Sequence, residues 1–188
     1  MDTWGLPTSA VIGGKEYAIH ADYREVLDLL AVLQDPQQSE WERWYIALAL
    51  FYEDGEAIPA DAHQEAMEYL VEFINCGQQE ESGRPAPRLM DWQQDALAIV
   101  AGVNKAAGCE VRALPFLHWW SFMAFFNGIG EGQLATLVSI RDKLRRGKKL
   151  ESWEREYYRD HRAEVDLAPR YTAEELAEQR RLKELLGE

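Results

Sequence analysis

Histidine and cysteine are the side chains here that could hold a metal or act as nucleophiles. The four histidines are His20, His63, His118 and His161. None of them has a partner at the HExxH spacing that places two ligands on one helical face. The two cysteines, Cys76 and Cys109, lie far apart and form no CxxC motif. The sequence therefore predicts no metal site, no cofactor and no catalytic residue, and we expect a protein that is not an enzyme.

The glycine-rich stretch GIGEG, at residues 128–132, could in principle bind phosphate. A phosphate-binding glycine loop follows a strand and continues into a Gly-Lys-Ser or Gly-Lys-Thr sequence. GIGEG instead follows an apolar run typical of a helix, and no such continuation is present. The pattern favours a turn between two helices, where glycine supplies backbone freedom.

The aromatic stretch before that turn, LHWWSFMAFFNGIGEG at residues 117–132, is the most unusual feature of the sequence. It places five rings between Trp119 and Phe126. On a helix that begins at Phe116, apolar residues occur all around the axis. A helix of this kind in a globular protein is usually the central core helix. The alternative is that part of it is exposed in a groove for a partner, because large exposed apolar patches mark binding sites. Both interpretations stay open.

The basic run RDKLRRGKK, at residues 141–149, carries six bases and one acid. It suits the C-terminal end of a helix, where cations interact favourably with the helix dipole and Gly147 ends the helix. It also suits contact with an acidic surface, on this chain or on a partner. Nucleic acid is disfavoured, because residues 1–140 carry 21 acids against 7 bases.

If the chain binds a partner, the aromatic stretch and the basic run are where we expect the contacts. The predicted contact residues are Trp119, Phe122, Phe125, Phe126, Arg141, Arg145, Arg146 and Lys149. Aromatic contacts should persist in salt, whereas basic contacts should weaken as exposed charges are screened.

The elements that would position these residues are mostly helices. Residues 11–19, VIGGKEYAI, predict a β-hairpin whose two-residue turn is Gly13-Gly14. Helices are predicted over 22–35, 39–54, 61–77, 91–105, the aromatic stretch, 132–147, 151–165 and 172–187. Capping pairs three residues apart, such as Ser39 with Glu42 and Asp61 with Gln64, mark several of the starts. The polar stretch around 78–90, with its prolines, predicts an exposed linker.

The predicted fold is therefore mainly α, a bundle-like single body of several helices with a short N-terminal β-hairpin. We expect a helical domain over residues 1–167 and a C-terminal helical tail over 168–188. The net charge of −13, the lack of a targeting segment and the absence of a long apolar run favour a cytoplasmic protein that binds neither membranes nor nucleic acid.

Three parts of the chain together resemble the bacteriophage gene-product-fifteen family of long-tailed phages and prophages. They are the early KEYAIHADYREVLDLLAVLQD with IPADAHQEAMEYLVEFINCG, then LHWWSFMAFFNGIGEG, then SIRDKLRRGKKLESWEREYYRDHRAEVDL. The resemblance extends from about Tyr17 to Leu167. Its most specific parts are the tryptophan-pair helix, the IRxKLxxGKKLxxWExxYY pattern and the closing VDL.

The resemblance implies a role in tail assembly, because such proteins are encoded near the major tail protein and the tape-measure protein. It implies a non-catalytic tail assembly chaperone that binds the tape-measure protein or other tail proteins in the host cytoplasm. The alternative is a structural tail or connector component retained in the virion, and a homo-oligomer also stays open. No catalytic or binding residue is carried over from the family.

Overall fold

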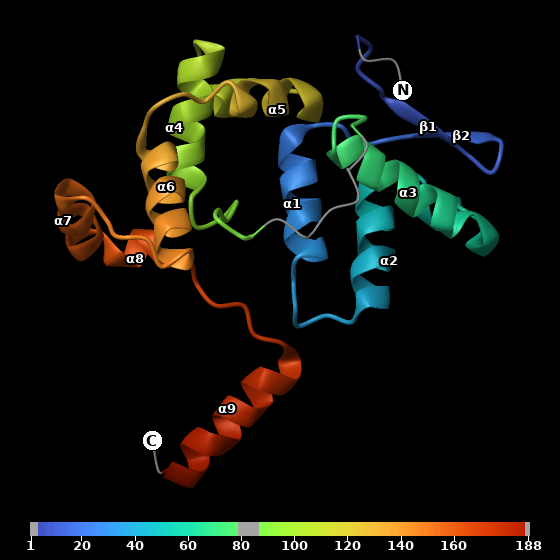
Figure 1. Ribbon diagram of the computed structural model, residues 1–188. Coiled ribbons are helices and arrows are strands. Elements are labelled where there is room, and N and C mark those ends of the chain that lie inside the picture. The colour runs from blue at the N-terminus through green and yellow to red at the C-terminus, as the bar shows by residue number, and fades with distance from the viewer. Residues whose placement is uncertain (1–3, 79–86, 187–188) are drawn as a thin grey trace. The chain divides into compact units, whose positions relative to one another are not determined.

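The computed structural model describes residues 4–78 and 87–186 and divides the chain into two compact units (Figure 1). The first unit comprises residues 1–79 and 169–188, and the second comprises residues 80–168. The first division falls in the predicted linker 78–90, of which residues 79–86 lie outside the described part. The mainly α fold with an N-terminal hairpin is confirmed. The predicted helical domain 1–167 and tail 168–188 stay predictions.

The hairpin is formed by β1 (Ser9–Ile12) and β2 (Lys15–Ala18), which pair antiparallel with Ile12 opposite Lys15. Gly13 and Gly14, with φ of 58° and 79°, make the two-residue turn as the sequence predicts. A turn with positive φ at both positions matches the right-handed twist of the strands, and glycine adopts it without strain.

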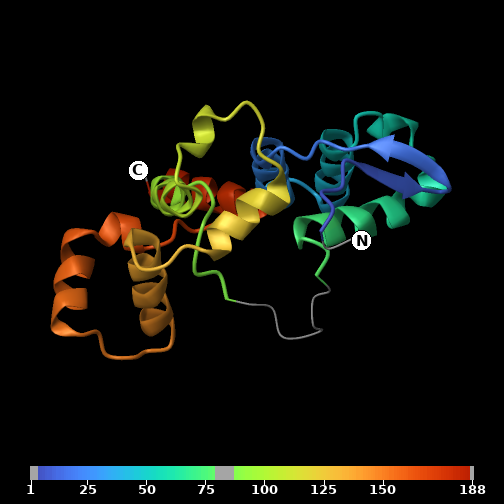
Figure 2. The same cartoon turned by 90° about the horizontal axis from the view of Figure 1, so that it is seen from above.

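Three helices complete the body of the first unit: α1 (Tyr23–Leu33), α2 (Glu40–Phe51) and α3 (His63–Ile74). Short 3-10 turns, η1 (Gly55–Ala57) and η2 (Ala60–Ala62), lead into α3. Figure 2 shows the hairpin beside α3, where the Tyr69 hydroxyl donates to the Ser9 carbonyl at 2.9 Å. The buried apolar residues of this unit include Ile12, Val26, Leu29, Phe51, Tyr52, Leu70 and Phe73.

Of the predicted capping pairs, Ser39 with Glu42 caps a helix and Asp61 with Gln64 does not. The Ser39 side chain accepts from the Glu42 N–H while the Glu42 carboxylate accepts from the Ser39 N–H, so the predicted capping box of α2 is confirmed. The predicted start at Asp61 is wrong, because η2 occupies Ala60–Ala62 and α3 begins at His63 without a side-chain cap. The spacing of two polar residues does not show whether a helix begins at the first of them or a few residues later. For α3, a start at Asp61 or at His63 leaves the same apolar side chains facing the core.

The second unit contains α4 (Ala96–Ala107), η3 (Val111–Ala113), α5 (Trp119–Asn127), α6 (Gln133–Arg145), α7 (Ser152–Asp160) and α8 (Arg162–Val165). Its buried apolar residues include Ile99, Val103, Trp119, Phe122, Leu137, Ile140 and Val165. The helix predicted from Asp91 begins only at Ala96, because residues 92–95 form a separate turn. The last helix, α9 (Ala173–Leu186), belongs to the first unit, and its described side chains are exposed apart from the half-buried Leu176.

Candidate interaction surface

The aromatic helix α5 begins at Trp119, three residues later than the sequence predicts. The buried His118 side chain sets this start, since its Nδ1 accepts a hydrogen bond from the Trp120 N–H at 3.0 Å. A histidine at the N-cap satisfies one of the amide groups that the first turn leaves without a partner. Phe116, which the sequence placed in the helix, lies outside it and is 54% exposed.

The first half of α5 is core. Trp119 and Phe122 are each 1% exposed and stack with their ring centroids 5.6 Å apart. Trp92, from the turn before α4, packs edge-on against Trp119 at 6.0 Å. Two of the four predicted aromatic contacts therefore face the interior, where a partner cannot reach them in this fold.

The second half of α5 keeps part of its surface. Phe125 and Phe126 are half-buried, and the ring of Phe126 lies 5.0 Å from that of Trp92. The two interpretations of the aromatic stretch thus divide along the helix, with core residues at its start and partly accessible rings at its end.

Arg141 is also an interior residue, 6% exposed, although the sequence placed it among the surface contacts. Its guanidinium donates to both oxygens of the Asp95 carboxylate, at 2.6 and 2.8 Å. It also donates to the carbonyl oxygens of Leu89, Glu164 and Val165 at 2.7 to 3.0 Å. Arginine suits this position because its rigid fork can hold a carboxylate with two parallel bonds. Arg141 therefore joins α6 to the segments before α4 and around α8.

The other three predicted basic contacts are exposed at the end of α6. Arg145 and Arg146 both pair with Asp142, each at 2.9 Å. Lys149 follows in the exposed segment after Gly147, whose φ of 63° ends the helix. The predicted helix C-terminus with Gly147 as its stop is thus confirmed. Arg145, Arg146 and Lys149 remain available to a partner, and they lie on one helix end.

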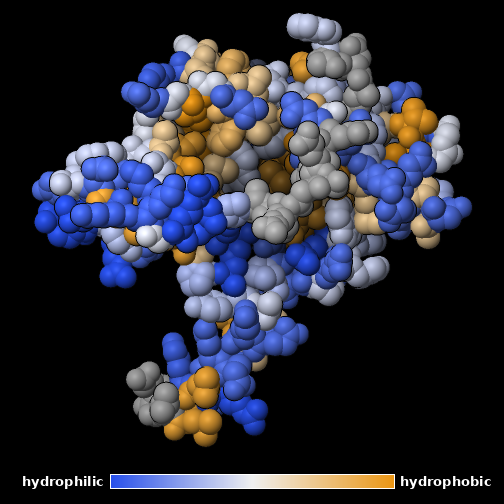
Figure 3. All heavy atoms as spheres, viewed as in Figure 1, coloured by the Kyte–Doolittle hydropathy of each residue, from blue (hydrophilic) through white to orange (hydrophobic). Residues whose placement is uncertain are grey.

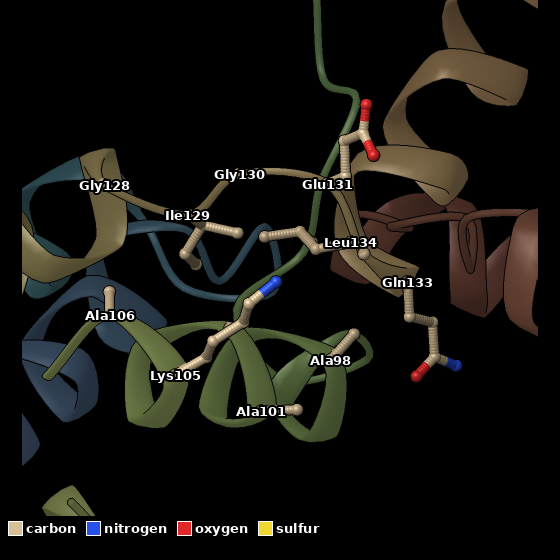
Figure 4. Close-up of a pocket in the computed structure, with 12 residues that line it drawn as sticks. Ala98, Ala101, Lys105, Ala106, Gly128, Ile129, Gly130, Glu131, Gln133 and Leu134 are labelled. Atoms are coloured by element: carbon tan, nitrogen blue, oxygen red, sulfur yellow. The ribbon is translucent and has the colours of Figure 1, made fainter. Parts of the chain in front are cut away.

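A pocket of about 470 Å³, hereafter the α4 pocket, lies between α4 and residues 128–134 (Figure 4). Its α4 wall is made of small residues and one lysine: Ala98, Ala101, Gly102, Lys105 and Ala106. Ile129 packs so closely on this wall that a Cβ added at Gly102 would lie 2.8 Å from its Cδ1. The predicted turn at GIGEG is confirmed, because residues 128–132 connect α5 to α6 and form the opposite wall.

Charge is sparse in the α4 pocket. Figure 4 shows the Lys105 side chain reaching toward the space between Ile129 and Leu134, while Glu131 and Gln133 point away from that space. Gln133 is held outward by donating to the Glu164 carboxylate at 3.1 Å. In Figure 3 the region over α4 shows hydrophobic tan and orange atoms with hydrophilic blue groups among them, whereas the region over α7 is mostly hydrophilic. The pocket thus presents apolar walls with one ammonium group at its mouth.

Sequence reasoning missed the α4 pocket, although a signal for it exists. Ala98, Ala101, Gly102, Lys105 and Ala106 recur at the spacing of one helical face. A face of alanine and glycine leaves space beside a helix where larger side chains would fill it. The opposite wall of the pocket comes from residues 128–134, which follow α5 in the sequence. Local periodicity cannot show that this segment lies beside α4.

Further properties of the described residues concern metal binding and shifted pKa values. In the described part, no group of three His, Cys, Asp or Glu side chains could hold a metal ion. Burial raises the pKa of the half-buried Cys76 thiol to about 11. The Lys143 ammonium holds the pKa of the Glu154 carboxyl below its usual range, chiefly through hydrogen bonds of 2.6 and 2.7 Å. Among residues 4–78 and 87–186, no helix combines the length and apolar character needed to cross a bilayer.

One protein-family model matches the chain, that of the family described as Bacteriophage Gp15 protein, and the match covers residues 5–167. It therefore includes the hairpin, the α4 pocket and the basic end of α6, and it stops before α9. No curated protein and no solved structure matches the chain.

Proposed function

We propose that this chain, which belongs to the bacteriophage Gp15 family, is a tail assembly protein of the chaperone type. It binds apolar helical segments of the tape-measure protein in the host cytoplasm, before the tail tube encloses them. The proposal assigns no catalytic residue and no cofactor, because its mechanism is the temporary burial of apolar surface.

The α4 pocket is the observation that supports this proposal. Amphipathic helices are recognised when their apolar side chains enter a hydrophobic groove at intervals of three or four residues. The small side chains of Ala98, Ala101 and Gly102 let another helix approach α4 closely. A volume of about 470 Å³ is within the range of pockets that bury several apolar groups.

The charge at the pocket mouth favours a particular kind of segment. The Lys105 ammonium is the one charged group of the α4 wall, and Glu131 on the opposite wall points away from the space. A carboxylate next to the apolar side chains of the bound helix would complement it, and complementary charge improves both selectivity and association rate. The exposed Arg145, Arg146 and Lys149 are candidates for further contacts with acidic residues of the same partner. Trp119, Phe122 and Arg141 support the fold beneath this surface.

Co-expression with the cognate tape-measure protein tests the proposal. Wild-type chain should raise the amount of soluble tape-measure protein and should co-purify with it. Ala101→Trp should remove both effects, because the indole would fill the α4 pocket from an exposed position. Ala177→Trp, an exposed alanine of α9 outside the pocket, is the matched control and should behave as wild type.

Two outcomes would count against the proposal. If wild-type chain brings no gain in soluble tape-measure protein, the chaperone function is wrong. If Ala101→Trp works as well as wild type, the pocket is not the binding site. Mass spectrometry of purified particles distinguishes a chaperone from a structural component. A structural tail or connector component would be present in the mature virion, and a chaperone would be absent.

A further inference from the structure

A second candidate surface lies on α2 in the first unit, apart from the residues of the proposed function. Trp41 and Tyr45, one helical turn apart, are 71% and 48% exposed. Their rings stack with centroids 5.3 Å apart and an interplanar angle of 11°. We call these two residues the α2 aromatic pair. Large rings are usually placed where most of their surface is buried, so an exposed stack of two is a candidate contact surface.

No cation of the described chain occupies the α2 aromatic pair. The cation–π contacts in the described residues are Lys15 over Tyr17 and Arg24 over Tyr23. Arg43, which lies between the two rings in sequence, is half-buried and donates to the Leu33 carbonyl at 3.1 Å. Arg43, the base nearest in sequence, is therefore directed to the end of α1, and in the described residues no cation lies over the Trp41 ring, which stays 71% exposed.

The charge around the pair is strongly negative. Residues 1–79 contain 15 Asp and Glu against 3 Lys and Arg, a net charge of −12, whereas residues 80–168 contain 13 of each and are neutral. Glu40 and Glu42 flank Trp41 and are exposed. The capping box holds Glu42 in place through its bonds to Ser39 at 2.7 and 2.9 Å. An acidic field of this kind attracts basic segments and repels acidic ones.

We infer that the α2 aromatic pair is a docking site for a basic segment of another protein, with a Lys or Arg side chain over the Trp41 ring. Tryptophan is the aromatic residue that holds a cation best. The flanking carboxylates pair with further bases of the same segment. The Trp41 and Tyr45 rings provide the specific contact, and the surrounding carboxylates attract the basic segment to this surface.

A labelled peptide measures this docking directly. The probe is an amphipathic helix of leucine and lysine, about 18 residues long so that it can hold a helix. Its twin carries glutamate in place of every lysine. Fluorescence anisotropy at about 0.15 M salt, where charges beyond roughly 8 Å are screened, gives the Kd of each peptide for the full chain. The lysine peptide should bind and the glutamate peptide should not.

Exposed tryptophans provide matched variants. Trp41→Ala should weaken binding of the lysine peptide at least about tenfold, as truncation of an anchoring aromatic does. Trp153→Ala removes a 57% exposed tryptophan of α7 in the second unit and should leave the Kd unchanged. Glu40→Lys keeps both rings and should weaken binding through charge alone. Circular dichroism melting confirms that each variant is folded.

The inference fails if Trp41→Ala binds the lysine peptide as tightly as wild type, since that would mean that charge alone attracts it. It fails equally if the lysine peptide does not bind, or if the glutamate twin binds as well. If Trp41→Ala proves unfolded, Tyr45→Ala provides the same comparison from the other ring of the stack.

Discussion

The Arg141 guanidinium holds both carboxylate oxygens of Asp95 in a buried pair whose side chains are 5% and 1% exposed. The two residues are 46 positions apart and bring α6 against the start of α4. The remaining donors of Arg141 reach three backbone carbonyls, so the buried charge is surrounded by acceptors. Removing one member of such a pair leaves the other charge buried without a partner.

Asp95→Ala should therefore lower the free energy of unfolding by about 3–5 kcal/mol. Urea denaturation followed by tryptophan fluorescence gives this value. The control is Arg145→Ala, which removes an exposed pair with Asp142 and should cost less than about 1 kcal/mol. Equal losses in the two variants would contradict the assigned role of the buried pair.

Gly102→Ala should destabilise the second unit, although alanine is the better helix former. The added Cβ would lie 2.8 to 3.0 Å from three side-chain carbons of Ile129, and overpacking of this kind costs about 1–3 kcal/mol. In an Ile129→Ala background the clash disappears, and the same change should stabilise by up to about 1 kcal/mol. Thermal melting of the four proteins in this cycle checks the reversal of sign. The same sign in both backgrounds would show that Ile129 does not pack on Gly102.

Glu154 should make the stability of the second unit pH-dependent in acid. Its pKa lies below the ordinary value of 4.5, first because Lys143 donates to the carboxylate. Since the folded-state pKa is depressed, the stabilisation is present above pH 4.5 and is lost as the pH falls through the folded-state pKa. Glu154→Gln should flatten the decline in unfolding free energy over that window. A decline as steep as that of wild type would assign the acid sensitivity to other carboxylates.

The two cysteines should differ in their reaction with a thiol reagent. Cys109 is exposed, whereas Cys76 is half-buried and its pKa is raised to about 11. The thiolate is the reactive form, so at pH 8 Cys76 should react much more slowly than Cys109. Labelling with iodoacetamide followed by peptide mass spectrometry distinguishes the two sites. Cys76→Ser should abolish only the slow phase, and equal rates in wild type would show that Cys76 is accessible as thiolate.

Removal of the residues after Ala168 should leave the rest of the chain folded. The described side chains of α9 bury little surface, and the family match ends at residue 167. Truncation should shift the melting temperature only slightly, because little apolar area is returned to water. A large drop in the melting temperature would show that α9 packs on the chain in solution, and would refute the predicted C-terminal tail.

Local sequence patterns predict the type and order of most elements of this protein, although the starts of α3, α4 and α5 differ from the predicted ones. Gly13 and Gly14 favour the hairpin turn because glycine adopts the positive φ angles of both turn positions without strain. Ser39 with Glu42 fixes the start of α2, and Gly147 ends α6, because each acts on backbone groups within four residues. Helical periodicity located most helices because apolar side chains of one helical face recur every three or four residues. The family resemblance, carried by the same local patterns, agrees with the family match.

Which of these residues face solvent depends on contacts that form in the folded chain. In the sequence Arg141 is one more base of a basic run. In the structure it is buried and donates to both carboxylate oxygens of Asp95, which lies 46 positions earlier. Trp119 and Phe122 become core through Trp92, while Trp41 and Tyr45, equally apolar in sequence, remain exposed. The α4 pocket forms from two segments about 30 residues apart in sequence. Burial depends on contacts between distant segments, and local spacing does not encode them.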